Sequence, residues 1–365
     1  MKIIELCANY PNLLGGTALS YVKVRNHYYH EMGIDDITIL NFALPSGGYM
    51  MDGFEVISLK KYEEEYVNDK FDILICHAPN IRNHYLFLKR YQLKFSNVIF
   101  FFHGHEVLSL RTEYPIPYNY QWKRRLSRFV SPIYDKLKFY LWHRYFIKQS
   151  DNVHLVFVSE WIRDRFEYYL RLKLSEIRSK SYLIRNGVSR RFEEGFYDNN
   201  SPKEYDFITI RSDLDEPKYA VDVVNNLAKS NPQYSFLLIG RGEFFTHFKK
   251  AENIVQIERY LTPDEVVSFL NKSRCGLMPT KNDTQGIMAC EMATFGMPLI
   301  TSDIDVCKVV FEGFPNVKFI SNENGQLDLS SICSNLKMSD QKIEKFFYSN
   351  TIVKEVELLN KIIED

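Results

Sequence analysis

The sequence predicts an α/β protein of two domains, each built on a parallel sheet covered by helices. Short apolar runs alternate with helical or polar segments, which is the pattern of repeated strand–helix units. The 365 residues are too many for one ordinary hydrophobic core and suit two. A polar stretch at 190–206 separates two such series and is expected to be a linker. We therefore predict doubly wound domains at 1–190 and 191–344.

The first domain is expected to begin with a strand at 3–7. A turn-rich loop follows and brings Gly15 and Gly16 to the start of a helix expected at 17–32. Adjacent glycines let a backbone approach a ligand at a helix N-terminus, although a plain turn also accounts for them. Further strands are predicted at 37–40, 54–59, 71–76, 98–102, 153–158 and 182–184.

The strand predicted at 98–102 ends in His103-Gly104-His105-Glu106, which places three ionisable groups just past its carboxyl end. In an open α/β sheet this is the edge where ligands bind. A simple capped strand end is the alternative for His103. The His-x-His pair also suggests zinc, but no further ligands follow at metal spacing, so no metal site is predicted.

Residues 121–148 combine eight basic side chains with one acid, Asp135, and many aromatic rings. The basic residues are Lys123, Arg124, Arg125, Arg128, Lys136, Lys138, Arg144 and Lys148. A helical region of this kind suits an anionic bilayer surface, with cations on the headgroups and rings at the interface. An equally good alternative is a solvated basic face over an aromatic core. Nucleic-acid binding is not expected, because no recognised module accompanies the charge.

The formal net charge is zero, but it is unevenly distributed. Residues 1–200 hold 28 Lys and Arg against 22 Asp and Glu, whereas residues 201–365 hold 18 against 24. This asymmetry argues against general polyanion binding and for one basic surface on the first half. No apolar run approaches the ~20 residues of a membrane span, and the first strand does not resemble a signal peptide. Six widely spaced cysteines indicate reduced thiols in a cytoplasmic protein.

The second domain is expected to open with a strand at 207–210, followed by Arg211 and, across a loop, Lys218. These two cations can neutralise two phosphate charges without a metal ion, the Lys as a point charge and the Arg as a fork. Ordinary surface ion pairing is the alternative. A strand predicted at 236–240 leads into Gly240-Arg241-Gly242, but the third glycine of a nicotinamide-dinucleotide fingerprint is absent.

The stretch 278–302 is expected to contain the loop, helix and strand that complete a parallel connection. Asp283 lies in the loop and Glu291 on the helix, with Gly286 between them. A helix N-terminus offers free N–H groups and a partial positive charge, so this loop is a natural seat for a diphosphate. The carboxylates would then accept hydrogen bonds from the hydroxyls of a nucleotide-sugar, one on each sugar. Alternatively, Glu291 solvates a helix face and Asp283 a turn.

An acid, then Gly286, then a Glu eight residues after the acid, followed by Met292-Ala293 and Gly296-Met297-Pro298, resembles the donor-site signature of the family-4 retaining glycosyltransferases of GT-B fold. The usual first acid of that family is Glu, whereas this chain has the shorter Asp283. The resemblance implies two Rossmann-like domains facing a central cleft. It also implies an inter-domain turn at 186–188 and a C-terminal helix, at about 345–365, that packs back on the N-terminal domain.

The same resemblance assigns roles to individual residues. It implies catalytic roles for Arg211, Lys218, His103 and Asp283. It implies donor-binding roles for Gly15, Gly16, Gly240, Gly242, Tyr260, Gln285, Gly286, Ile287 and Glu291.

The expected activity is metal-independent transfer of a hexosyl unit, with retained configuration and without a cofactor. The donor is expected to be a nucleoside-diphosphate sugar, most simply a UDP-sugar. The acceptor is expected to be a glycan or lipid-linked glycan of surface polysaccharide synthesis, at the inner face of the cell membrane. The alternatives are a catalytically silent GT-B subunit and a nucleotide-sugar epimerase of similar fold.

Overall fold

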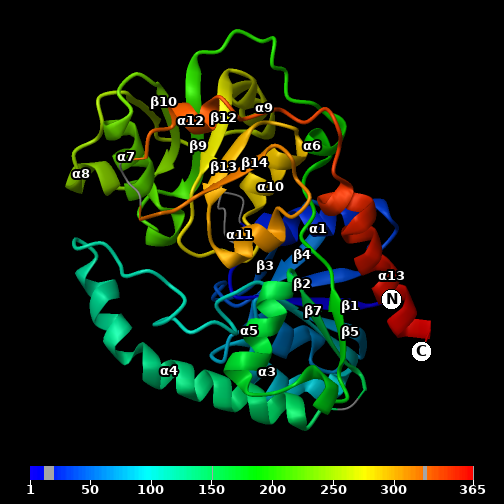
Figure 1. Cartoon of the computed structure of the whole chain (residues 1–365). Helices are drawn as coiled ribbons and strands as arrows, with labels where there is room; N and C mark the ends of the chain where they lie inside the picture. Colours follow the sequence, from blue (N-terminus) through cyan, green and yellow to red (C-terminus); the bar gives the residue numbers. More distant parts are fainter. Residues whose placement is uncertain (12–19, 150, 324–326, 365) are drawn as a thin grey trace. The chain divides into compact units, whose positions relative to one another are not determined.

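The structure, a computed structural model, describes residues 1–11, 20–149, 151–323 and 327–364. The chain forms two compact units, each with a mainly parallel sheet and helices packed against it (Figure 1). Unit 1 comprises Met1–Ser109, Pro132–Asn186 and Ser349–Asp365, and unit 2 comprises Leu110–Ser131 and Gly187–Tyr348. The predicted fold class of two doubly wound α/β domains is therefore confirmed. Gly15 and Gly16 lie outside the described residues.

The described part of unit 1 contains a sheet of eight strands in the order β3-β4-β2-β1-β5-β6-β7-β8. The strands are β1 Ile3–Cys7, β2 Ile37–Asn41, β3 Gly48–Met51, β4 Phe54–Ile57, β5 Phe71–His77, β6 Phe95–Phe102, β7 Val153–Phe157 and β8 Lys180–Leu183. All neighbours pair in parallel except β3 and β4, which form a hairpin. Asp52 and Gly53 turn this hairpin with positive φ angles of 51° and 87°, as a tight two-residue turn requires. Strand β3 was not predicted, because its four residues are too few to show a strand pattern and are mostly exposed.

The main helices of unit 1 are α1 Ser20–Glu31, α3 His84–Tyr91, α5 Glu160–Leu170 and α13 Ile352–Glu364. The long helix α4, Trp122–Ile147, begins in unit 2 and ends in unit 1. Shorter helical turns are α2 Leu59–Lys61, Tyr62–Tyr66, Gln92–Lys94 and Leu174–Glu176. The C-terminal helix was expected from about 345, but it begins at Ile352. Ser349-Asn350-Thr351 precedes it, and such residues favour caps and turns over a helix interior.

Helix α13 packs on α1 through a buried ion pair. The guanidinium of Arg25 donates from Nε and Nη2 to the two carboxylate oxygens of Glu355, at 2.6 and 2.9 Å. Tyr29 donates to the same carboxylate at 2.7 Å, and Arg25 also reaches the Asn186 side chain at 3.2 Å. A fork-shaped pair with these extra hydrogen bonds satisfies most of the buried charge.

The described part of unit 2 contains a parallel sheet of six strands in the order β11-β10-β9-β12-β13-β14. The strands are β9 Tyr205–Asp213, β10 Phe236–Arg241, β11 Ile254–Ile257, β12 Ser273–Met278, β13 Leu299–Ser302 and β14 Val317–Ile320. The helices are α6 Arg190–Glu194, α7 Val221–Ser230, α8 Phe244–His247, α9 Pro263–Asn271, α10 Ile287–Thr294, α11 Asp305–Val310 and α12 Ser330–Cys333, with 3-10 turns at Pro217–Tyr219, Glu344–Phe346 and Tyr348–Asn350. Thr262 and Glu265 form the capping box that starts α9.

Residues 110–131 group with unit 2, although the sequence analysis assigned the whole of 1–190 to the first domain. Tyr118 explains this grouping, because it is buried in the apolar core that α7, β10 and α8 share. Its ring lies 5.1 Å from that of Phe244. Aromatic anchors in a loop, here Tyr118 together with Tyr120, leave no periodic signal in the sequence, so this grouping could not be predicted.

Five cysteines are buried thiols, and Cys333 is partly exposed. Within the described ranges, no helix is both long and apolar enough to span a bilayer.

Candidate functional site

In the sheet of unit 2, the direction in which successive strands follow one another changes between β9 and β12. Along the chain β9 comes first, β10 and β11 follow on one side of it, and β12, β13 and β14 follow on the other side. In open α/β sheets a ligand crevice lies outside the carboxyl ends of the strands at such a switch point. Arg211 lies near the end of β9, and the loop containing Asp283 follows β12. The strand order therefore brings these two predicted residues to one edge.

Arg211 is a buried cation at this edge, with 8% of its surface exposed. Its Nη2 donates to the Pro279 carbonyl at 2.6 Å, and its guanidinium lies over the Tyr219 ring at 5.0 Å. Its Nε has no hydrogen-bond partner among the described residues. Burial lowers the pKa of Arg211, and the Asp283 carboxylate opposes this shift. A buried guanidinium with an unused N–H is suited to an anion.

Asp283 is engaged within its own loop. Its Oδ1 accepts from the backbone N–H groups of Thr284 and Gln285, at 2.7 and 3.3 Å. Gly286 caps α10 with a φ of +70°, and a Cβ there would lie 3.0 Å from Asp283 Oδ2. Only glycine fits this left-handed position beside the carboxylate. Asp283 thus places a negative charge at the N-terminus of α10, where it is favourable.

A narrow cleft is lined by four of the predicted residues, Arg211, Asp283, Gln285 and Gly286. Its volume is about 10 Å³, roughly the minimum that holds one water molecule. A hexosyl unit does not fit inside this cleft, so a sugar could reach Arg211 and Asp283 only from its rim. Lys218, Ile287 and Glu291 lie outside its lining.

Glu291 is half-buried on α10, one turn after the first residue, Ile287. Burial raises the pKa of Glu291 to about 7, and a hydrogen bond from the Ser189 backbone N–H opposes the rise. Ser189 follows directly on the turn at 186–188, where the chain passes from unit 1 to unit 2. The carboxylate is therefore held in place but retains acceptor capacity for hydroxyl groups.

Lys218 lies in the 3-10 turn Pro217–Tyr219, which follows β9. Its backbone carbonyl accepts from Lys281 N–H at 2.8 Å and from Thr280 Oγ1 at 2.9 Å. These bonds tie the Lys218 turn to the loop after β12. Its ammonium lies 5.0 Å from the Tyr219 ring, the ring that also faces Arg211. Lys218 and Arg211 therefore flank one aromatic side chain.

A segment at 113–124, which the sequence analysis did not assign to this site, braces the Lys218 turn. Tyr120 donates to Asp215 Oδ1 at 2.5 Å, and its ring stacks on His247 with a centroid distance of 3.9 Å. Tyr118 donates to Asp222 at 3.0 Å, and Arg124 pairs with Glu216. Further bonds run from Gln121 to the Asp215 carbonyl and from Asn282 to the Glu113 carbonyl. Acids on both sides of Lys218 are thus fixed by this segment.

Gly240, near the end of β10, and Gly242, just after it, are explained by close contacts with residues 211–215. A Cβ on Gly240 would lie 2.2 Å from the Arg211 carbonyl oxygen, and one on Gly242 would lie 2.9 Å from Asp215 Oδ2. Asp215 also accepts the Glu243 N–H at 2.8 Å. The predicted donor contact of these glycines is not needed to account for them.

Tyr260, Gln285 and Ile287 have different settings. Tyr260 is exposed, and the Arg241 guanidinium lies over its ring at 4.4 Å. Gln285 is buried in the loop before α10, and Ile287 is half-buried. Within the described residues, no group of three or more His, Cys, Asp and Glu side chains is placed to hold a metal ion.

His103 lies in unit 1, directly after β6 as predicted. Its backbone N–H donates to Glu106, and its ring lies 4.3 Å from the Tyr21 ring. Burial lowers the pKa of His103 well below its ordinary value. Its Nε2 is buried without a hydrogen-bond partner in the described part of the chain. The imidazole is therefore neutral and has one ring nitrogen available.

Glu5 lies on β1, which β5 separates from β6, and is fully buried. Asn26 donates to its Oε2 at 2.6 Å, and His77 Nε2 lies 3.6 Å from its Oε1. Burial raises the pKa of Glu5 to about 7, and Asn26 and Arg25 oppose this rise. A buried acid in the middle of a strand is a polar feature that the apolar residues around it in β1 do not explain.

Comparison with known proteins supports the interpretation of unit 2. Residues 209–329 match the sequence family described as Glycosyl transferases group 1. No curated protein matches the chain.

Solved structures are similar to the whole chain. Sucrose-phosphate synthase from Thermosynechococcus elongatus matches with a TM-score of 0.72 and 11% identity over 100% of both chains. A glycosyltransferase from Rickettsia africae ESF-5 matches with a TM-score of 0.65 and 12% identity over 100% of this chain and 99% of the other. WaaG, a glycosyltransferase involved in lipopolysaccharide biosynthesis, has a TM-score of 0.59 and 12% identity over 91% and 90%. The chain thus has the GT-B fold of glycosyltransferases, and its residues 209–329 match the group 1 glycosyl transferase domain.

Proposed function

We propose that the chain is a retaining glycosyltransferase of family 4 that transfers a hexosyl unit from a UDP-sugar. The observation that carries this proposal is the buried Arg211, with an unused N–H beside Asp283 at the switch point of unit 2. The match of residues 209–329 to group 1 glycosyl transferases supports it. We infer that donor binding and leaving-group stabilisation take place at this edge of the sheet.

The charges at the site suggest which residues bind each part of the donor. The Asp283 carboxylate already lies at the N-terminus of α10, so a phosphate at the same point would meet a like charge. The diphosphate is therefore better placed with Arg211 and Lys218, and Asp283 is left to accept from a neutral sugar hydroxyl. As the bond to the leaving diphosphate breaks, charge grows on it, and both cations stabilise that charge. No metal ion is required for this role.

Glu291 is proposed to bind the ribose hydroxyls. A carboxylate has two oxygens that match two neighbouring hydroxyls, and the Ser189 N–H holds it in place. The raised pKa means that part of the population is protonated near neutral pH. Binding of two hydroxyl donors favours the ionised form.

The acceptor is proposed to be a glycan or lipid-linked glycan, bound by unit 1 at the cytoplasmic face of a membrane. The neutral His103 at the end of β6, with a free Nε2, supports a polar acceptor or transferred sugar near this strand end. WaaG acts in lipopolysaccharide biosynthesis, which supports a role in surface polysaccharide synthesis. Contact with an anionic membrane is proposed through 121–148.

A catalytically silent subunit is the second candidate, and one observation favours it. Asp283 is shorter than the usual Glu and is engaged by two loop amides, at the rim of a cleft too small for a sugar. In an active enzyme, a hydroxyl of the donor sugar would have to donate a hydrogen bond to this carboxylate from the rim of the cleft. The nucleotide-sugar epimerase has no such observation in its favour.

The test is incubation of the purified protein with radiolabelled UDP-sugars in the absence of acceptor. Slow release of UDP supports the transferase, and an isomerised sugar identifies an epimerase. Binding of UDP in a thermal-shift assay without either product identifies the silent subunit. An Arg211→Ala variant serves as the control, since it removes the cation on which the proposal rests.

A further inference from the structure

Helix α4 carries an unusually large number of exposed apolar side chains. They are Trp122, Leu126, Phe129, Val130, Ile133, Leu137, Tyr140 and Ile147. Phe129 and Ile133 are 79% and 73% exposed. Soluble surfaces rarely present so many large apolar groups in one place unless a partner covers them.

These residues lie on one face of the helix. At 3.6 residues per turn, their spacing confines them to a stripe roughly 100° wide along α4. The buried residues of the same helix, among them Lys138, Trp142 and Phe146, fall on the opposite face. Helix α4 therefore presents its apolar stripe to solvent, whereas its packed face, which begins at Ser131, carries Asp135 and Lys138 as well as Trp142 and Phe146.

Basic residues border the exposed stripe. Lys123, Arg125, Lys136, Arg144 and Lys148 lie along or beside it, and Asp135 is the single acid of the helix. Asp135 is itself buried and lies 3.1 Å from the Lys138 ammonium. A second copy of this helix would bring like charges together, which is unfavourable. An anionic bilayer offers both an apolar phase for the stripe and negative charge for its border.

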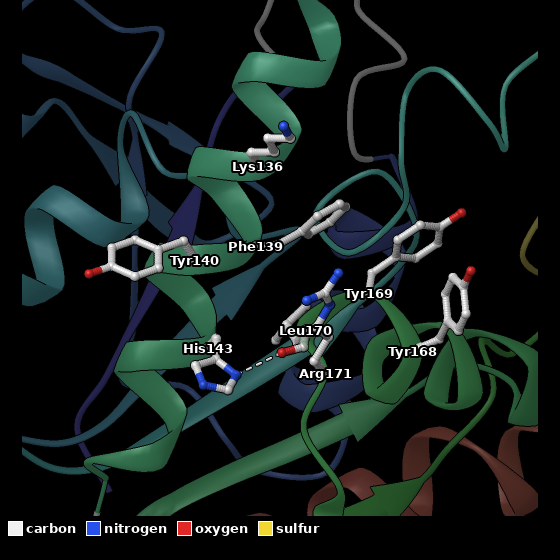
Figure 2. Close-up of a pocket in the computed structure, with 8 residues that line it drawn as sticks. All are labelled: Lys136, Phe139, Tyr140, His143, Tyr168, Tyr169, Leu170 and Arg171. Atoms are coloured by element: carbon white, nitrogen blue, oxygen red, sulfur yellow. Dashed lines mark hydrogen bonds between the residues drawn. The ribbon is translucent and has the colours of Figure 1, made fainter.

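A groove of about 770 Å³ opens between α4 and the end of α5, beside the stripe. Figure 2 shows Phe139 and Tyr169 next to each other in its lining, and their rings stack with a centroid distance of 5.1 Å. The guanidinium of Arg171 lies between the two helices. His143 and the Leu170 carbonyl are joined by a hydrogen bond of 2.7 Å, which fixes the spacing of α4 and α5.

The groove has a cationic and aromatic lining without a carboxylate. Lys136 and Arg171 supply the charge, and the rings of Tyr140 and Tyr168 are exposed. Arg171 ends α5 in the left-handed conformation, with a φ of +50°. This arrangement suits a phosphate headgroup, with aromatic side chains at the level of the lipid interface.

We propose that the exposed stripe of α4 inserts into the surface of an anionic bilayer, and that the groove between α4 and α5 takes a phospholipid headgroup between Lys136 and Arg171. This inference rests on the proposed function only in giving a reason for membrane contact. It assigns that contact to the apolar stripe together with the groove, whereas the sequence pattern indicated only a basic aromatic region. The helix lies in the plane of the interface and does not span it.

The first test is co-sedimentation with vesicles of phosphatidylcholine containing phosphatidylglycerol, and with vesicles of phosphatidylcholine alone. The variant Ile133→Ser/Leu137→Ser should lose at least about tenfold in partitioning to the anionic vesicles, since two inserted side chains are removed. The matched control is Leu93→Ser, which replaces a fully exposed leucine of another element. Its partitioning should equal that of the wild type.

The second test separates the groove from the stripe. Lys136→Ser/Arg171→Ser should weaken binding to phosphatidylglycerol vesicles more at low salt than at high salt, because the headgroup contact is electrostatic. The stripe variant should weaken binding at both salt concentrations. Trp122 provides a direct probe, because its fluorescence should shift to the blue with anionic vesicles and the shift should vanish in Trp122→Phe.

Three outcomes would overturn the proposal. These are equal sedimentation of wild type and the stripe variant, no binding by the wild type, and a dimer by light scattering that only the stripe variant dissociates. The last outcome would assign the stripe to a second copy of the chain. UDP binding and UDP release, measured without vesicles, report on the glycosyltransferase function alone. Failure of one set of measurements therefore leaves the other interpretable.

Discussion

Tyr120 is the residue whose replacement best tests how the Lys218 turn is positioned. The substitution Tyr120→Phe removes the hydroxyl that donates to Asp215 and keeps the ring that stacks on His247. Asp215 retains its bond from the Glu243 N–H, so the fold of unit 2 should survive. We expect the variant to loosen the turn between Asp215 and Asp222, and with it the ammonium of Lys218.

The magnitude follows from the contact itself. A hydrogen bond to a charged acceptor contributes ~1.5 to 3 kcal/mol, and the half-buried position of Tyr120 favours the lower end. If donor binding loses most of this ~1.5 kcal/mol of free energy, affinity for a UDP-sugar falls about tenfold. If half of it reaches the site, the loss is roughly threefold. We therefore expect a three- to tenfold loss.

The assay is a double-mutant cycle with Lys218→Ala, measured by titration of UDP. If Tyr120 acts through Lys218, then Tyr120→Phe should weaken UDP binding in the wild type and have little effect in Lys218→Ala. Tyr168→Phe is the control, because Tyr168 is exposed and lies in unit 1. Additive losses in the cycle would refute the role of Tyr120 in positioning Lys218. An unchanged UDP affinity in Tyr120→Phe would show that the segment at 113–124 does not support the donor site through Tyr120.

Three further predictions concern charged residues. Glu291→Ala should weaken UDP binding about ten- to a hundredfold, since the ribose hydroxyls lose their acceptor. The UDP affinity of the wild type should rise between pH 6 and 8, because the pKa of Glu291 is raised to about 7 and the ionised form binds. A UDP affinity that does not change with pH would contradict this. Arg211→Ala and Lys218→Ala should lower kcat more than donor affinity, with activity unaffected by a chelator; a change in KM alone would remove their leaving-group role. Glu5→Gln should stabilise unit 1 at pH 8, by at most roughly 3 kcal/mol, and should not stabilise it at pH 4. Burial raises the pKa of Glu5 to about 7, so the folded state of the wild type loses stability as pH rises from about 4.5 to 7. Equal melting temperatures of variant and wild type at pH 8 would refute this prediction.

The strands and their alternation with helices were predictable because they rest on local apolar patterns. The runs that predicted β5, β6, β7, β9 and β10 are apolar at consecutive positions because both faces of these central strands are covered, so that every side chain is selected for burial. The capping box at Thr262 was predictable for the same local reason. By contrast, β3 is only four residues long and depends on a hairpin turn, so it is too short to show a strand pattern of its own.

The candidate site was predictable where its residues follow strands of one sheet. Arg211 and Asp283 belong to β9 and the loop after β12, and adjacent parallel strands end at the same edge. The engagement of Asp283 by the Thr284 and Gln285 amides was not predicted as such, although a turn role was left open. The carboxylate could be placed in the loop, but its direction depends on the positive φ of Gly286.

The brace at 113–124 could not be predicted, because its residues meet their partners across about a hundred positions of sequence. Tyr118 and Tyr120 come from the chain between β6 and α4, and Arg124 comes from the first turn of α4; they contact Asp222, Asp215 and Glu216, respectively. Of these, only Arg124 belongs to the basic and aromatic region at 121–148, which predicted either a bilayer-binding surface or a solvated basic face. The structure divides that region: Gln121 and Arg124 at its beginning contact the loop that carries Lys218, whereas side chains further along α4, such as Ile133 and Leu137, are exposed. Because α4 is continuous with the brace, a lipid that orders α4 also restricts the chain that ends at Tyr120. Vesicle binding should therefore tighten UDP binding in the wild type and have no effect in Tyr120→Phe, and equal UDP affinity with and without vesicles in the wild type would show that the two surfaces act independently.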